Sequence, residues 1–143
     1  MTRTTGRAAG AIAALAVVIA LAGCAAGAAS TVNYAGTPHG VDEATLTGET
    51  QAFYVDDAGA IAVVLWGSST CPPIGERMVV EQPAGEGNAV RVDVRATPAD
   101  QPCTRDLVPH TSVFVTPSDV TTTEPLTVRV DDAEYELVNE VAE

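Results

Sequence analysis

The stretch Trp66-Gly67-Ser68-Ser69-Thr70-Cys71-Pro72-Pro73 stands at the centre of the pattern that decides the fold. It follows Ala60–Leu65, an apolar run without a polar break. A short apolar run that contains β-branched residues and is bounded by glycines indicates a strand buried on both faces. Trp66 closes this strand and is the only tryptophan of the chain, so we expect its side chain to lie in the core.

Strand patterns recur at short spacing on both sides of this run. In Ala89–Ala96 the valines alternate with charged residues, which predicts a strand with one buried face and one wet face. Turns rich in Pro, Gly and Asp separate the runs. The chain is therefore expected to be all-β, a small antiparallel β-sandwich or barrel of about seven short strands with one disulfide. The expected strands are Gln51–Val55, Ala60–Trp66, Arg77–Glu81, Ala89–Ala96, Thr111–Thr116, Leu126–Val130 and Glu134–Val138.

The first residues have the pattern of a targeting segment. Arg3 and Arg7 precede the apolar run Ala11–Ala22, which is too short to span a bilayer comfortably because a span needs about 20 apolar residues. Leu21-Ala22-Gly23-Cys24 follows and resembles the lipobox of bacterial lipoproteins. The resemblance implies cleavage before Cys24, attachment of a lipid to its thiol, and location on the outer face of the cell membrane. An ordinary secretory signal with a chance cysteine and an uncleaved membrane anchor are the alternatives.

These patterns divide the chain into three parts. Residues 1–23 are expected to be a lipoprotein signal peptide. Residues 24–48 are rich in Ala, Gly, Ser and Thr and are expected to form a flexible tether a few nanometres long, with at most one helical turn at Val41–Leu46. Residues 49–143 are expected to form the β domain.

The charge balance excludes some classes of partner. The chain has 7 basic and 19 acidic residues, a net charge of −12, and it has no lysine. Loss of Arg3 and Arg7 with the signal peptide would bring the charge to −14. A surface of this sign repels polyanions, so we expect no nucleic-acid partner. The expected partners are the membrane, through the lipid anchor, and an envelope protein or a small ligand.

Two cysteines remain after Cys24. Outside the cytoplasm, Cys71 and Cys103 are expected to form a disulfide, because such bonds persist in oxidising compartments. A metal site or a redox-active pair would favour a CxxC spacing, which the chain lacks. We therefore expect no metal site and no cofactor.

The polar residues offer no recognisable catalytic set. Ser68 and Ser69 follow a strand end, but a serine nucleophile needs an oriented base and the GxSxG pattern is absent. His110 is the one candidate base; it could pair with Asp106 or lie unpartnered in a loop, while His39 is expected to be solvated. We expect the hydroxyl groups to bond backbone groups in a stiff loop. The paired aspartates at 56–57 and 131–132 are expected to form turns, since neither fits a calcium loop.

Residues 50–138 also resemble small, uncharacterised lipoproteins of actinobacteria. The resemblance rests on the lipobox, on the stretch from Trp66 to Pro72, and on Pro102-Cys103-Thr104 with Leu126-Thr127-Val128. It implies a location and brings no activity. The expectation is a non-enzymatic binding or envelope-associated module; the alternative is a small extracytoplasmic hydrolase or inhibitor with its site in the disulfide-linked loops.

Overall fold

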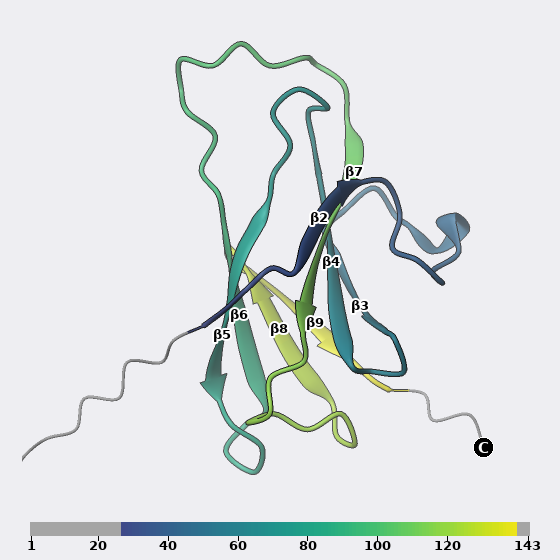
Figure 1. Ribbon diagram of the computed structural model, residues 1–143, viewed down its shortest axis with the longest axis vertical. Helices are drawn as coiled ribbons and strands as arrows, with labels where there is room; N and C mark the ends of the chain where they lie inside the picture. Colours follow the sequence, from purple (N-terminus) through teal and green to yellow (C-terminus); the bar gives the residue numbers. More distant parts are fainter. Residues whose placement is uncertain (1–26, 140–143) are drawn as a thin grey trace, which may run out of the picture.

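The structure is a computed structural model that describes residues 27–139. The predicted signal peptide and Cys24 lie outside these residues. The described chain is all-β, as predicted, and forms two sheets that pack face to face as a small β-sandwich (Figure 1). Its strands are β1 Ala28–Ala29, β2 Val32–Ala35, β3 Gln51–Val55, β4 Ala60–Gly67, β5 Gly75–Gln82, β6 Ala89–Val94, β7 Val108–Val115, β8 Leu126–Val130 and β9 Ala133–Leu137.

One sheet has the strand order β1-β5-β6-β8-β9 and the other β2-β7-β4-β3. All neighbouring pairs are antiparallel except β6 and β8, which run parallel. The core lies between the sheets, where alternate residues of β4, β6 and β8 meet. Its largest fully buried side chain is Phe114 of β7. Other large, fully buried hydrophobic side chains of the domain are Ile61, Val63, Val64, Met78, Val90, Val92, Leu126 and Val128.

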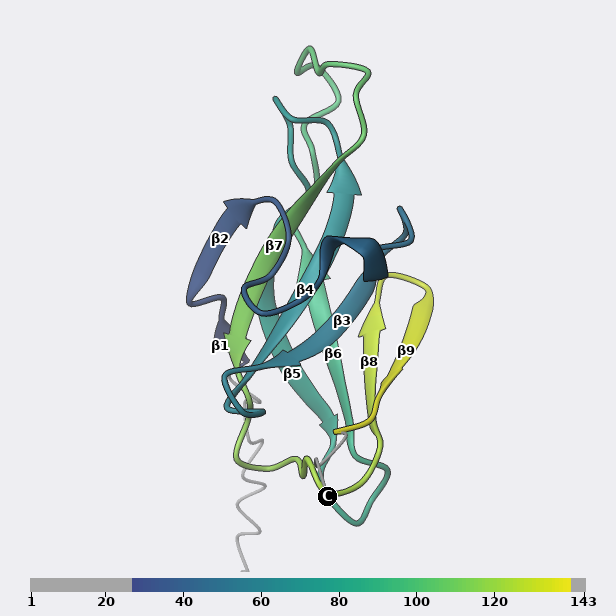
Figure 2. The same ribbon diagram turned by 90° about the vertical axis from the view of Figure 1, so that its right-hand side faces the viewer.

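Strand β4 is buried on both faces, as its apolar sequence predicted. Ile61, Val63 and Leu65 face the other sheet and belong to the core. The segment between β2 and β3 crosses the opposite face of the sheet and covers β4 and β7 (Figure 2). This segment contains a short 3-10 helix, Glu43–Thr45, where the sequence allowed one helical turn. The side chain of Asp42 caps it by accepting a hydrogen bond from the N–H of Ala44 at 2.9 Å.

The expected flexible tether is wrong for the described part of residues 24–48. Strand β1 pairs with β5 and strand β2 pairs with β7, so the β domain begins at the first described residues and not at residue 49. The small residues there serve close packing. A Cβ atom at Gly27 would lie 2.6 Å from the carbonyl oxygen of Met78, closer than real Cβ contacts.

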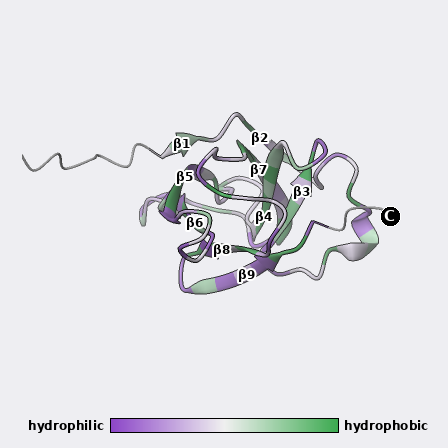
Figure 3. Cartoon of the chain, turned by 90° about the horizontal axis from the view of Figure 1, so that it is seen from below, coloured by the Kyte–Doolittle hydropathy of each residue, from purple (hydrophilic) through white to green (hydrophobic). Residues whose placement is uncertain are grey.

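Charged side chains on the outer face of the sheet that contains β5, β6, β8 and β9 form ion pairs. Arg91 of β6 bonds Glu81 of β5 and Asp93, and Arg129 of β8 bonds Glu81 and Glu134. The alternation predicted for β6 is therefore confirmed, with Val90 and Val92 buried and Arg91 on the wet face. Figure 3 shows hydrophilic colour along β9 and hydrophobic colour on β4 and β7.

Both aspartate pairs lie in turns, as predicted. Asp56, Asp57 and Asp131 have positive φ angles of 52°, 52° and 51°, a region that aspartate tolerates better than most residues. Among residues 27–139 there is no helix long and apolar enough to cross a bilayer.

Candidate functional site

Two long loops meet at one end of the sandwich (Figure 1). One joins β4 to β5 and spans residues 68–74; the other joins β6 to β7 and spans residues 95–107. Strands β4 and β6 both end there because each is followed by a strand that returns in the opposite direction. The backbone N–H of Arg95 donates to the carbonyl oxygen of Ile74 at 2.8 Å, which ties the bases of the two loops together.

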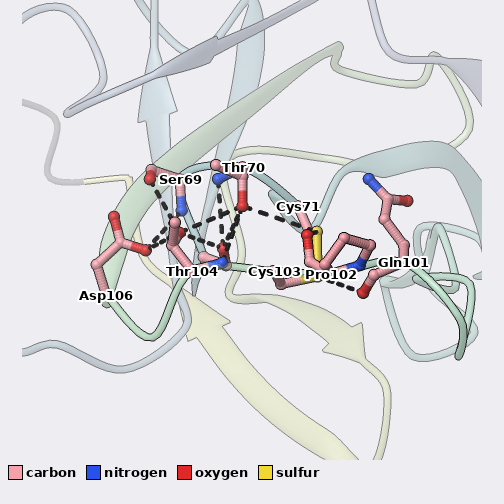
Figure 4. The surroundings of a disulfide bond; sticks show 9 residues. Ser69, Thr70, Cys71, Gln101, Pro102, Cys103, Thr104 and Asp106 are labelled. Carbon is pink, nitrogen blue, oxygen red and sulfur yellow. Dashed lines mark hydrogen bonds between the residues drawn. A yellow bond between two sulfur atoms is a disulfide. The ribbon is translucent and has the colours of Figure 1, made fainter.

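The predicted disulfide joins these loops farther out. The bond between Cys71 and Cys103 holds their Cα atoms 5.5 Å apart (Figure 4). The Cys71 side is buried, whereas Cys103 is exposed. Glycine is required at position 67 because of a close approach and not because of its backbone conformation. A Cβ atom at this position would lie 2.5 Å from Cδ of Pro73. The first loop therefore folds back against the end of its own strand.

A cluster of hydroxyl groups surrounds the carboxylate of Asp106 beside the disulfide (Figure 4). The backbone N–H of Ser69 donates to Asp106 Oδ1 at 3.1 Å, and Thr104 Oγ1 bonds the same oxygen. Thr104 Oγ1 lies 2.8 Å from Ser68 Oγ, and the N–H of Thr104 donates to Thr70 Oγ1 at 2.9 Å. We call this set, Ser68, Ser69, Thr70, Thr104 and Asp106, the hydroxyl cluster.

Hydrogen bonding sets the charge state of the cluster. Hydrogen bonds from the side chains of Ser69 and Thr104, and then from the backbone of Ser69, lower the pKa of Asp106 from 3.8 to about 2. Asp106 is therefore a carboxylate at any physiological pH, able only to accept hydrogen bonds. Its role in this geometry is to order the donors around it. It is too acidic to act as a general base near neutral pH.

The expected pairing of His110 with Asp106 and the expected place of His110 in a loop are both wrong, whereas the expected lack of a partner is confirmed for Nε2. The residue lies in β7, which begins at Val108 and not at Thr111, and its side chain faces inward with 9% of its surface exposed. Its partner is not Asp106, which bonds Ser69 and Thr104 instead. The Nε2 atom of His110 is buried without a hydrogen-bond partner, and burial lowers the pKa of the imidazole.

The prediction that Trp66 lies in the core is also wrong. Strand alternation places Trp66 on the outer face of its sheet, next to Pro109 in the register, while Leu65 takes the inward position. The side chain is half-buried and its indole Nε1 has no hydrogen-bond partner among the described residues. The apolar run alone could not identify this face, because β4 is buried on both sides.

The remaining candidate residues lie apart from the loops. His39 is exposed in the segment after β2, with its ring centroid 5.6 Å from that of Tyr34. Within residues 27–139 there is no group of three or more His, Cys, Asp or Glu side chains placed to hold a metal ion.

A small hollow opens beside the disulfide, with a volume of about 130 Å³. Apolar rings and polar side chains from both loops line it, and the guanidinium of Arg95 at its border is held by Glu76 at 2.6 Å. The lining residues are Thr70, Cys71, Pro72, Ile74, Arg95, Ala96, Thr97, Pro98 and Gln101.

Two exposed side chains alternate with the cluster residues Thr104 and Asp106 in the second loop. Leu107 is 63% exposed, the most exposed of the large hydrophobic residues in the described chain. Arg105 is exposed and forms no ion pair with any residue that the structure describes, unlike Arg77, Arg91, Arg95 and Arg129. The loops thus combine a rigid, internally bonded base with an unpaired cation and an apolar side chain in solvent.

Comparison of the chain with protein-family models, with curated proteins and with solved structures gives no match. The sequence could have identified more of the cluster than it did. Once Cys71 and Cys103 are paired, their neighbours Thr70 and Thr104 must lie close together, and Asp106 follows two residues later.

Proposed function

We propose that this chain is a lipid-anchored extracytoplasmic protein of the bacterial envelope, and that it binds a partner through the two disulfide-linked loops without catalysing a reaction. One observation carries the proposal. An exposed Leu107 and an Arg105 without an ion-pair partner among the described residues lie together on loops that a disulfide and the hydroxyl cluster hold rigid. Rigid loops lose little conformational freedom on binding, which favours recognition. Leucine and arginine side chains in solvent suit a partner that offers an apolar surface and an acceptor of positive charge.

The lipid anchor would place the domain close to the membrane. Only two residues separate Cys24 from Gly27, the first described residue. Consecutive Cα atoms are about 3.8 Å apart, so three such steps reach no more than about 11 Å. Ala28 of β1 lies opposite Met78 and Ala29 opposite Arg77, so the chain at Gly27 points away from the disulfide-linked loop that precedes Gly75; the two loops extend beyond one end of the sheets (Figure 2). This arrangement would leave the loops accessible on the membrane-anchored protein.

The alternative is a small hydrolase or inhibitor that uses the same loops. Its support is the concentration of serine and threonine hydroxyls beside a carboxylate and a small hollow. Catalysis by Ser68 or Ser69 needs a base within hydrogen-bond reach. The carboxylate that Ser69 and Thr104 contact has a pKa of about 2, which makes it a weak base.

Site-specific photo-crosslinking tests the proposal. A photoreactive amino acid is placed at Leu107, and at Glu136 of β9 as an exposed control on another edge of the domain. Irradiation of intact cells should join Leu107, but not Glu136, to one envelope component, and Arg105→Glu should suppress the product. Equal crosslinking at both positions, or none at Leu107, would exclude the loops as the binding site.

A further inference from the structure

Strand β2 is an edge strand whose outer side pairs with no strand of residues 27–139. The register between β2 and β7 determines which backbone groups lie on that outer side. The N–H of Gly36 donates to the carbonyl oxygen of Pro109 at 2.9 Å, and pairing alternates along an antiparallel ladder. Val32 and Tyr34 therefore pair with β7, whereas the N–H and C=O groups of Asn33 and Ala35 point outward.

This edge lacks the features that usually prevent strands from pairing between molecules. Natural edge strands carry charges, prolines or bulges, or are covered by other elements. Strand β2 is short, with four residues, but it has no charge, proline or bulge: the chain from Gly27 to Val41 has no Asp, Glu, Lys or Arg, and neither has β7. Val32 is 48% exposed on the same edge. The edge strand β9 of the other sheet differs, because it carries Glu134 and Glu136 and lies close to β3.

Charge decides which partner this edge can take. The chain has a net charge of −12, so two copies repel each other over most of their surfaces. A basic partner protein would be attracted to the acidic surface, and the uncharged edge would add no electrostatic attraction for it. Strand β2 carries no charged side chain, so two copies can pair along it without placing like charges on the paired strands. A two-fold axis makes such a contact self-complementary.

We propose that the protein forms a symmetric dimer in which the β2 strands of two copies pair in antiparallel orientation across a two-fold axis at Tyr34. Asn33 of each copy then pairs with Ala35 of the other, which gives four backbone hydrogen bonds and joins two four-stranded sheets into one. The two Tyr34 residues face each other at the intervening position without backbone bonds. Cross-strand aromatic pairs at such positions stabilise sheets.

Cysteine crosslinking in membranes tests this register with the full-length chain. The Cα atoms of facing residues at a non-hydrogen-bonded position lie about 4.5 Å apart, within the range that a disulfide spans. Tyr34→Cys should therefore give a covalent dimer on a non-reducing gel under mild oxidation. Glu136→Cys on the edge strand β9 is the matched control and should remain monomeric.

A second change tests the backbone pairing itself. Asn33→Pro in the Tyr34→Cys chain removes an outward N–H and leaves the ladder to β7 intact, so the domain should still fold. Loss of two hydrogen bonds per dimer should lower the yield of covalent dimer by about tenfold or more. Asn33→Asp adds like charge to the edge and should also lower the yield of covalent dimer. An unchanged melting temperature and native disulfide identify either variant as folded.

Three results would overturn the proposal. Tyr34→Cys could remain monomeric, Glu136→Cys could dimerise to the same extent, or Tyr34→Cys could form its disulfide with a different protein. The last result would assign the edge to a heterologous strand partner. None of these results depends on the loops at the far end of the domain, so the proposed binding function is tested separately.

Discussion

Thr104 donates its backbone N–H to the hydroxyl oxygen of Thr70 at 2.9 Å, across two loops separated by 34 positions in the sequence. Each residue is adjacent to a cysteine of the disulfide, so the covalent bond and the hydrogen bond reinforce the same contact. The disulfide limits how far the loops can separate, and the hydroxyl cluster fixes how they face each other. Together they explain how 7 and 13 residues without regular secondary structure hold a defined shape.

Removal of the disulfide should destabilise the domain substantially. The bond closes a loop with a sequence separation of 32 residues. The chain-entropy model gives roughly 3.5–4 kcal/mol for a loop of this length. We expect the double variant Cys71→Ser and Cys103→Ser to lose about that much in urea unfolding at pH 7, with β strand content retained by circular dichroism before the transition. A loss below about 1 kcal/mol would contradict a structural role for the bond.

The carboxyl group of Asp106 should titrate well below an ordinary aspartate. Its pKa is lowered to about 2 by the hydrogen bonds from Ser69 and Thr104. A lowered pKa in the folded state stabilises the protein above pH 3.8, and this contribution is lost as the pH falls from 3.8 toward 2. NMR titration of the side-chain carboxyl carbon measures it directly. Thr104→Val should raise the pKa, and a wild-type value near 3.8 would show that the cluster does not form.

His110 should make the domain sensitive to mild acid. Burial lowers the pKa of its imidazole below 6.5, so the unfolded chain takes up the proton more readily than the folded one. Stability should therefore decrease as the pH falls below 6.5 toward the folded pKa. His110→Leu removes the unpartnered Nε2 and should abolish this decrease between pH 7 and 5.

Asn88 should be one of the most sensitive polar positions in the domain. Its side chain is 3% exposed and joins two loops, donating to the carbonyl oxygens of Thr121 and Pro125 at 2.9 Å and accepting from the N–H of Thr121. Asn88→Gly tolerates the φ of 50° but loses these bonds, so we expect a cost of about 2–4 kcal/mol in urea unfolding. Asn88→Asp retains the acceptor but turns a carboxylate oxygen toward the carbonyl oxygens of Thr121 and Pro125, so it should also destabilise the domain. A cost below about 0.5 kcal/mol for Asn88→Gly would exclude this role.

The sequence predicted the fold class and the disulfide because alternation, turn residues and cysteine count are local signals. It missed β1 and β2 because small residues indicate flexibility when read alone. Here Gly27 is required where the backbone approaches Met78, which only the folded structure reveals. It also missed the start of β7, because a proline usually excludes a central strand. Pro109 is tolerated in β7 because strand β2 ends beside it. Pro109 has no N–H to offer the carbonyl oxygen of Gly36, and Thr111 Oγ1 donates to that oxygen instead.

The candidate site was predictable only where its signals are local in the sequence. Ser68 and Ser69 stood out beside Cys71, and their role as hydrogen-bonding groups in a stiff loop follows from their short side chains. The contributions of Thr104 and Asp106 depend on a contact between distant loops. The inward side of His110 and the outward side of Trp66 depend on strand register, which a run of apolar residues does not specify.

The central claim, that the disulfide-linked loops form a rigid binding surface whose serines are structural, is tested most directly by a serine-reactive phosphonate. The full-length protein is treated at pH 7 to 8 and examined by peptide mass spectrometry, with a serine hydrolase as the positive control. We predict no adduct on Ser68 or Ser69, while Ser68→Ala lowers stability by about 1 kcal/mol through loss of its bond to Thr104. A stoichiometric adduct on either serine would contradict the claim and favour the hydrolase alternative.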